Sequence, residues 1–264
     1  MSYANPAAYE PFMGRWSARL TPSFLRFAQV KDGQHVLDVG CGTGILSRAI
    51  VSYGTTARVT GVDPLPEYIA FAQNAVPNPR ARFEVGRAEA LPFADKAFDA
   101  ALALLVLQDF TDQVQAVHEM ARVTHAGGMV AACIWDFELG LPMLSLLWQA
   151  AEAIAPDEVL RCRAGTRTRN PDPGDLETLW RECGLDGVTA ETFEIAMPFV
   201  SFEDYWQPIL GRSTPTSAFI AAIDGQTGGA LSRVLREKIA RFVQLDGSFV
   251  FPAHAWAIRG MARS

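Results

Sequence analysis

Residues 36–44 read Val-Leu-Asp-Val-Gly-Cys-Gly-Thr-Gly, and an amphipathic run follows at once from Ile45 to Tyr53. A short apolar run that turns into closely spaced glycines is typical of a buried strand, a tight turn and a helix start. Glycine has no Cβ, so a ligand can approach its backbone, and a helix N-terminus offers unpaired N–H groups. The stretch therefore predicts a ligand-binding loop between a strand and a helix.

The spacing of the glycines separates two classes of nucleotide-binding protein. A dinucleotide fingerprint, G-x-G-x-x-G, would need its third glycine at position 45, which is Ile45. The spacing here is G-x-G-x-G, with Asp38 two residues before the first glycine. This pattern resembles motif I of the class I S-adenosylmethionine (SAM) methyltransferases, whose family form is close to V-L-D-V-G-C-G-T-G.

Two later stretches continue the resemblance in order. A second predicted strand, Val59 to Val62, leads into Asp63, and an acid about 20 residues past a glycine loop is placed to bind ribose hydroxyls. The resemblance gives Asp63 that role. Residues 86–93 read G-R-A-E-A-L-P-F where the family commonly has G-D-A-x-x-L-P-F. The family Asp contacts the adenine amino group, and the backbone N–H of the next residue meets a ring nitrogen. Arg87 stands in place of that Asp here, so the resemblance does not carry the side-chain contact over, whereas the backbone contact of Ala88 can survive the change.

The rest of the first half alternates strands and helices. Ala100–Leu107 is a long apolar run typical of a buried strand, and 111–124 has helical spacing of apolar residues. After Gly127-Gly128, Met129–Trp135 predicts another strand. The family has E-M-x-R-V-x-x-P-G-G here, and the resemblance, which covers about residues 30–135, is to its type 11, ubiquinone/menaquinone-biosynthesis-like branch.

The resemblance implies SAM as cofactor and S-adenosylhomocysteine (SAH) as product. It implies cofactor-binding residues at the glycine loop, at the ends of the second to fourth strands and in the N-terminal segment: Asp38, Gly40, Cys41, Gly42, Asp63, Pro64, Ala88, Glu89, Leu104 and Arg15. The N-terminal Tyr9–Ser17 resembles a Y-x-x-F-M-x-R-W-S segment of the branch. It is either a packing helix or a lid that brings Arg15 near the methionine carboxylate.

The composition of the chain limits the classes of partner that it is expected to bind. The 264 residues carry a net charge of −6 and 49% hydrophobic residues, so nothing in the balance of charge indicates nucleic acid or an anionic membrane. No signal peptide and no apolar run of 18 residues is read, and the four cysteines contain no C-x-x-C pair. The four histidines are scattered, which argues against a metal site. We expect a cytoplasmic monomer or homodimer that acts on a small-molecule methyl acceptor.

The strand and helix pattern predicts an α/β fold, a doubly wound, mostly parallel seven-stranded, Rossmann-like sheet with a helical cap. Residues 1–30 would be an N-terminal lid, 31–136 the SAM-binding core, 137–174 a cap segment and 175–264 the completion of the sheet with a cap insertion at 201–247. The second half is predicted to contain helices at Leu141–Ile154, Asp175–Cys183 and Leu231–Val243, strands at Val188–Phe199 and Ser248–Ile258, and a loop at Arg161–Gly174. The last strand would be antiparallel, as in the family.

The catalytic residue stays unknown at this stage, because methyl transfer needs a general base only when the nucleophile must lose a proton. Gln108, Asp109 and Asp136 follow predicted strands and are equally placed for pocket contact or for the surface. His118 is expected at the surface. His254 is expected in the core, with a residue that reaches the pocket as the alternative. Four arginines belong either to a solvated loop or to a site for an anionic substrate group: Arg161, Arg163, Arg167 and Arg169. Five aromatic residues belong either to the core of the cap or to an apolar substrate pocket: Trp135, Trp148, Tyr205, Trp206 and Phe219.

Three functions are compatible with these features. The resemblance favours a SAM-dependent methyltransferase that acts on a small apolar or aromatic molecule. A SAM-binding protein without methyl transfer stays open because of Arg87 and the lack of an obvious base. A nicotinamide-dependent oxidoreductase is disfavoured by the glycine spacing. Turnover of SAM separates the first two, and titration with reduced nicotinamide cofactor tests the third.

Overall fold

The computed structural model describes residues 5–137, 139–163, 171–211 and 215–263. The chain divides into two compact units. The first, here called the sheet unit, comprises residues 14–135, 171–193 and 255–264, and the second, the helical unit, comprises residues 1–13, 136–170 and 194–254. The predicted segment boundaries, with a cap built from three pieces, stay a prediction.

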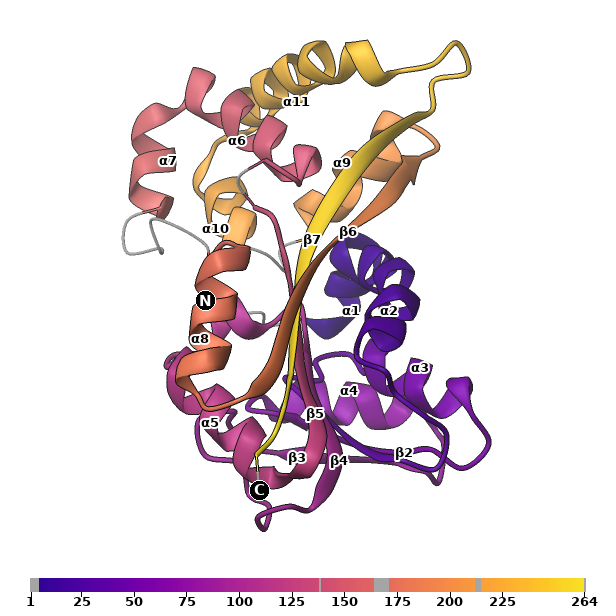
Figure 1. Cartoon of the computed structure of the whole chain (residues 1–264). Helices are drawn as coiled ribbons and strands as arrows, with labels where there is room; N and C mark the ends of the chain where they lie inside the picture. Colours follow the sequence, from indigo (N-terminus) through magenta and orange to yellow (C-terminus); the bar gives the residue numbers. More distant parts are fainter. Residues whose placement is uncertain (1–4, 138, 164–170, 212–214, 264) are drawn as a thin grey trace. The chain divides into compact units, whose positions relative to one another are not determined.

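A seven-stranded sheet has the order β3-β2-β1-β4-β5-β7-β6 (Figure 1). The first four pairings, from β3 to β5, are parallel, and β7 runs antiparallel to β5. This confirms the predicted doubly wound, mostly parallel sheet with an antiparallel last strand. The strands are β1 (His35–Val39), β2 (Arg58–Asp63), β3 (Ala81–Val85), β4 (Phe98–Leu104), β5 (Thr124–Trp135), β6 (Asp186–Phe199) and β7 (Phe249–Met261).

The strand order reverses between β1 and β4, and this switch point decides where a ligand can bind. The chain leaves β1 toward β2 and β3 on one side and continues with β4 and β5 on the other. In open α/β sheets, ligands bind outside the carboxyl ends of the strands at such a point. The loops that follow β1, β2, β3 and β4 all leave from that carboxyl edge, because these strands are parallel.

Helices of the sheet unit cover the parallel strands. Helix α3 contacts β1 and β2, α4 contacts β2 and β3, and α5 contacts β4 and β5. Buried apolar side chains, such as Leu37 and Ala103 of the strands and Met120 of α5, form a core between the strands and α5. The bounds are α2 (Arg15–Phe27), α3 (Ile45–Tyr53), α4 (Pro66–Ala75), the 3₁₀ turn η2 (Leu107–Asp109), α5 (Gln113–Val123) and α8 (Pro173–Glu182).

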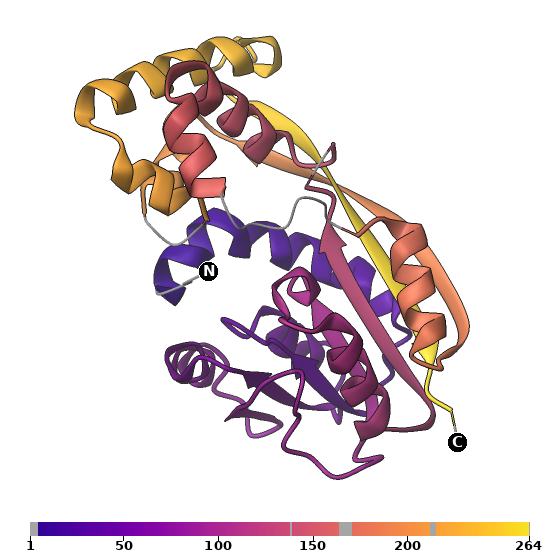
Figure 2. The same cartoon turned by 90° about the vertical axis from the view of Figure 1, so that its left-hand side faces the viewer.

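The helical unit packs around aromatic side chains. Phe199 stacks on Phe249 at 5.0 Å between ring centroids, and the hydroxyl of buried Tyr205 donates to the Met143 carbonyl at 2.6 Å. Helices α6 and α11 lie side by side (Figure 2). The elements are α1 (Pro6–Tyr9), the π-helical turn η1 (Glu10–Gly14), of which Gly14 belongs to the sheet unit, α6 (Pro142–Ile154), α7 (Pro156–Arg163), α9 (Phe202–Leu210), α10 (Pro215–Ala222), α11 (Gly225–Ile239) and η3 (Ala240–Phe242).

Several predicted boundaries are wrong. The strand expected over Met129–Trp135 begins earlier, at Thr124, because Thr124 already pairs with Phe98 of β4 and the strand continues through Gly127-Gly128. The strand expected over Ala100–Leu107 ends at Leu104, because Leu105 has a left-handed φ of 60° that no strand accommodates. The loop expected over Arg161–Gly174 is wrong at both ends, since α7 continues to Arg163 and α8 begins at Pro173, and residues 164–170 lie outside the described part. The helix expected over Leu231–Val243 starts earlier, at Gly225, because the Asp224 side chain caps it by accepting from Thr227 N at 2.7 Å.

Candidate cofactor site

The glycine loop, residues 40–44, has a backbone that only glycine adopts without strain. Gly40, Gly42 and Gly44 have φ values of 69°, 51° and 83°. A Cβ on Gly40 would lie 2.7 Å from a methyl carbon of Val106. Of the residues that the structure describes, a Cβ on Gly42 would meet only Tyr68, at 3.9 Å, so they leave space beside this glycine. The loop therefore presents bare backbone to an open volume at the carboxyl edge of β1.

Asp38 anchors this loop to the helix that follows it. Its side chain is buried and its Oδ2 accepts from the Ser47 hydroxyl of α3 at 2.7 Å. Burial raises the pKa of Asp38 to about 7; the Ser47 bonds partly offset this, and nearby Asp63 adds to it. The bond between Asp38 and Ser47 thus fixes the end of β1 to α3 on either side of the loop. Ser47 is a partner that the sequence analysis did not identify.

Asp63 joins the glycine loop to the end of β2. Its Oδ2 accepts from Gly42 N at 3.0 Å, and its Oδ1 accepts from Leu65 N at 3.0 Å. Burial raises its pKa, against the effect of these two backbone bonds. Each carboxylate oxygen has two lone pairs, so both oxygens can still accept one further hydrogen bond. The carboxylate therefore fits the ribose-binding role that the resemblance implies.

The loop of residues 86–93 follows β3 at the same edge and is fixed by charged side chains. Arg87 donates through Nη2 to the Thr111 hydroxyl at 3.1 Å and lies 3.4 Å from Glu89 Oε2. Glu89 accepts through Oε1 from Thr111 N at 2.8 Å and from Asp112 N at 3.4 Å. Ala88, between them, is buried. Glu89 thus binds the start of α5, and its predicted contact with the cofactor stays a prediction.

A second clamp on this loop was missed by sequence reasoning. Arg122 of α5 donates to the carbonyls of Phe93 at 2.9 Å and Leu91 at 3.1 Å, and Glu119 accepts from Leu91 N at 2.8 Å. Glu119 and Arg122 also pair with each other at 2.6 Å. These two residues are the Glu and Arg of the E-M-x-R-V stretch. The motif was therefore visible in the sequence, but its partners, about 30 residues away, were not.

The segment after β4 closes the other side of the glycine loop. Leu104 ends the strand half-buried, and Val106 occupies the position that a side chain on Gly40 would need. The Gln108 amide donates to the carbonyl of Leu105 at 2.8 Å and to Asp109 at 3.1 Å. Because both neighbours are acceptors, the amide nitrogen faces them, and Gln108 Oε1 is buried without a hydrogen-bond partner among the described residues. The sequence analysis placed Gln108 after the fourth strand but did not predict the burial of its amide oxygen.

The other predicted cofactor residues are distributed over the sheet unit. Cys41 is buried, which raises the pKa of its thiol well above the usual value and leaves it neutral. Pro64 is exposed next to Asp63. Arg15 opens α2, and its guanidinium lies 4.3 Å from the centroid of the Trp16 ring. The approach of Arg15 to a methionine carboxylate stays a prediction.

The remaining candidates fall into the two units. His118 is exposed on α5, as predicted. His254, expected in the core, has a side chain that is 40% exposed and lies 3.5 Å from Glu194, because β7 turns this residue outward among buried alanines. Asp136 is buried in the helical unit, where its Oδ1 accepts from Leu139 N at 3.1 Å. Most of the predicted aromatic set lies in the helical unit, Trp135 being in β5, and Arg167 and Arg169 lie outside the described residues.

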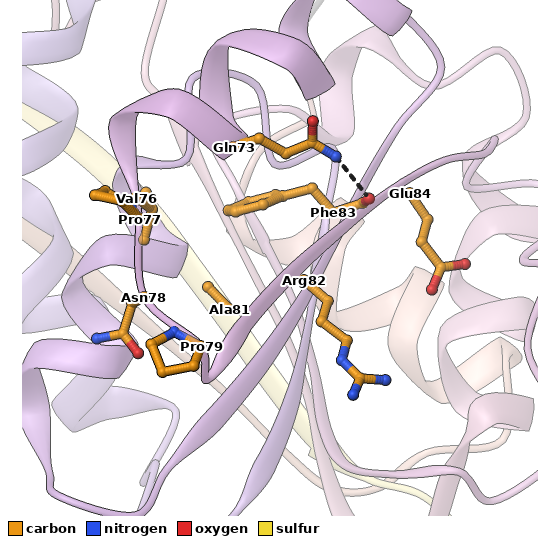
Figure 3. A pocket seen from close by; sticks show the side chains of 9 residues that line it. All are labelled: Gln73, Val76, Pro77, Asn78, Pro79, Ala81, Arg82, Phe83 and Glu84. Carbon is orange, nitrogen blue, oxygen red and sulfur yellow. Dashed lines mark hydrogen bonds between the residues drawn. The ribbon is translucent and has the colours of Figure 1, made fainter.

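A groove of about 560 Å³ lies elsewhere in the sheet unit (Figure 3). It is lined by the end of α4, the 76–79 segment and β3, and the Gln73 amide reaches the Phe83 carbonyl there at 3.5 Å. None of the predicted cofactor residues lines it. This groove at the sheet edge is therefore separate from the candidate cofactor site.

Within the described residues, no three His, Cys, Asp or Glu side chains are grouped so as to hold a metal ion. Of the described helices, none combines the length and apolar character needed to cross a membrane.

Comparisons with known proteins agree with the geometry of the site. Residues 37–132 match a family model described as a methyltransferase domain. A demethylmenaquinone methyltransferase from Roseiflexus castenholzii is 31% identical over 166 residues, which cover 58% of this chain and 68% of the relative. A malonyl-[acyl-carrier protein] O-methyltransferase from Erwinia billingiae is 35% identical over 130 residues, covering 49% of this chain and 50% of the relative. The chain spans about half the length of several curated relatives that it matches.

Solved structures share the fold at lower identity. A putative methyltransferase from Bacillus halodurans has a TM-score of 0.61 and 16% identity, over 92% of this chain and 99% of that chain. The [4+2]-cyclase SpnF has a TM-score of 0.55 and 21% identity, over 94% of this chain and 82% of that chain. The glycine loop, the two buried carboxylates, the sheet order and the Roseiflexus relative together identify this chain as a member of the class I SAM-dependent methyltransferase family, in its type 11 branch.

Proposed function

We propose that this protein binds SAM at the glycine loop and transfers its methyl group to a small apolar or aromatic molecule. The observation that carries the proposal is the bond from Gly42 N to buried Asp63. It holds a bare backbone and a carboxylate with spare lone pairs at the same place, beside the open volume at Gly42. Such a pair suits a ligand with vicinal hydroxyls that approaches the backbone closely.

The residues of the chain have three tasks in this reaction. The cofactor supplies a sulfonium whose methyl group is displaced in line, with a neutral thioether as leaving group. Asp63 would accept from the ribose hydroxyls, the glycine loop would lie along the methionine part, and the backbone of Ala88 would meet the adenine ring. Asp38, neutral over much of the range below pH 7, would support the loop without placing a second bare carboxylate beside Asp63. The protein thus contributes alignment and exclusion of water.

Gln108 is the residue that we propose for contact with the methyl acceptor. It follows β4 at the carboxyl edge, next to Val106, which contacts the position of Gly40. Its buried Oε1 has no partner in the part of the chain that the structure describes, and such an acceptor can be satisfied by a hydroxyl or amine of a bound molecule. Gln108→Leu should raise the KM for the acceptor while SAH affinity stays within twofold, and unchanged acceptor kinetics would contradict this role.

The direct test of the proposed function is formation of SAH from SAM with a panel of phenols, hydroxylated aromatic molecules and amines. Each turnover yields SAH and a methylated product, together with a proton when the acceptor is protic. We expect SAH to form at a rate that depends on the acceptor and to disappear in Asp63→Ala. SAH binding without turnover on any acceptor favours a SAM-binding protein without methyl transfer. Tight binding of reduced nicotinamide cofactor would favour an oxidoreductase.

The relatives do not define the acceptor, since by their names one acts on demethylmenaquinone and the other on a malonyl-[acyl-carrier protein]. The acceptor panel is therefore kept broad. The expected monomer or homodimer and the cytoplasmic location also stay predictions.

A further inference from the structure

We propose that residue 87 does not recognise the adenine amino group in this protein, and that the site therefore accepts SAM analogues altered at purine C6. The inference rests on the proposed function, because it concerns how the same site reads its cofactor. It starts from Arg87, which occupies the position where the family has the adenine-binding Asp.

The hydrogen-bonding chemistry of Arg87 excludes the usual contact. An amino group donates, so it needs an acceptor, and a guanidinium has five N–H donors and no acceptor. Protonation cannot reverse this, because arginine stays charged at every accessible pH. The side chain at position 87 therefore cannot replace the family carboxylate by any change of rotamer.

The structure gives Arg87 another task. It spans from the 86–93 loop to the Thr111 hydroxyl, 24 residues further along the chain, and it pairs with Glu89. Glu89 in turn accepts from the backbone of Thr111 and Asp112. Burial alone would raise the pKa of Glu89, but these backbone bonds and Arg87 bring it below its usual value. Arg87, Glu89 and Thr111 thus form a clasp between the 86–93 loop and the start of α5.

The clasp also engages Glu89, the acidic side chain next to Ala88 in this loop. Both lone pairs of Glu89 Oε1 are used by the two backbone N–H groups, and Oε2 faces the guanidinium. The Glu89 side chain is 16% exposed, whereas that of Arg87 is 60% exposed. The Arg87 side chain is therefore a solvated cation, and it forms no buried surface against which a bound ring could pack. Recognition of the ring is left to the backbone of Ala88 and to shape.

The test compares two ligands by calorimetry on the folded full chain: SAH, and the SAH analogue in which unsubstituted purine replaces adenine. The analogue keeps the ring nitrogens and lacks only the amino group. We expect the native protein to bind the two within threefold of each other. Arg87→Asp restores an acceptor, so it should bind SAH at least tenfold more tightly than the analogue. Arg87→Asn, whose amide oxygen also accepts, provides a second variant if the first does not fold.

Arg82→Asp is the matched control, because it makes the same change of charge at an exposed arginine of β3 outside the clasp. Its ratio of SAH to analogue affinity should equal the native ratio. A native preference for SAH of tenfold or more would overturn the inference and would indicate that another acceptor, such as Glu89, reads the amino group. Failure of SAH itself to bind would overturn the proposed function, and this inference with it.

Discussion

The glycine loop and the 86–93 loop leave the same edge of the sheet, but different forces hold them. The glycine loop is fixed by left-handed glycines and by two buried carboxylates, Asp38 and Asp63. The 86–93 loop is fixed by charged side chains, its own Arg87 and Glu89 together with Glu119 and Arg122 of α5, and most of these are partly exposed. A loop fixed by its own backbone tolerates almost no substitution, whereas a loop fixed by side chains can change a residue such as 87 and acquire a new clasp.

The largest effect is expected at Gly40. Alanine there must adopt φ near 69° and place its Cβ 2.7 Å from Val106, so Gly40→Ala should lower the free energy of unfolding by about 3 kcal/mol. Gly127→Ala is the control, since Gly127 has φ of 79° with nothing within 4 Å of the added carbon. It should cost only about 1–2 kcal/mol. If urea denaturation gives the same loss of unfolding free energy for Gly40→Ala and Gly127→Ala, the contact with Val106 makes no contribution.

Gly42 separates ligand binding from folding in the same loop. Gly42→Ala keeps the N–H that bonds Asp63, and among the described residues its Cβ meets only Tyr68 at 3.9 Å. We expect a stability loss like that of Gly127→Ala, about 1–2 kcal/mol, from the left-handed backbone. SAH affinity, measured by calorimetry, should fall at least tenfold because the methyl group enters the volume assigned to the cofactor. If affinity falls no more than in Gly127→Ala, the cofactor lies elsewhere.

Asp38 should make stability depend on pH in an unusual direction. Its pKa is raised from 3.8 to about 7 in the folded protein, so between about pH 4 and 7 the folded state holds a proton that the unfolded state has released. Lower pH therefore favours folding over this range. The free energy of unfolding of the native protein relative to Asp38→Asn should rise on going from pH 8 to pH 5, by at most about 1.4 kcal/mol per unit. If the difference in unfolding free energy between the native protein and Asp38→Asn stays constant from pH 8 to pH 5, Asp38 does not titrate in this range.

The two loops also differ in how far the sequence could predict them. The strand, the glycine turn and helix Ile45–Tyr53 were predicted correctly because every determinant lies within a few residues: the apolar run, the glycine spacing and the amphipathic period. Asp63 was identified by its distance from the loop. The bond from Asp63 to Gly42 follows from the parallel pairing of β1 and β2.

Contacts that join distant residues could not be predicted in this way. The partner of Arg87 is Thr111, and that of Arg122 is the Leu91–Phe93 segment, and neither pairing leaves a local pattern. The strand over Ala100–Leu107 was extended too far because hydrophobicity reports burial, and Leu105 and Leu107 stay buried after the strand has ended. The helical unit was predicted least well: α7 and α10 were missed, and α11 contains glycines that disfavour a helix until packing of Leu231 and Leu235 stabilises it.

The central claim, that the carboxylate bound to Gly42 N holds the cofactor, is tested most directly by calorimetric titration of SAH into Asp63→Ala. Each hydrogen bond from a ribose hydroxyl to this carboxylate is worth about 1.5–3 kcal/mol, so affinity should fall by about a hundredfold or more. Asp32→Ala is the control, because Asp32 also accepts backbone N–H groups, those of Thr56 and Ala57, at the opposite edge of the sheet. The account predicts native SAH affinity in Asp32→Ala and a large loss in Asp63→Ala, with circular dichroism showing both folded. Native affinity in Asp63→Ala would contradict it.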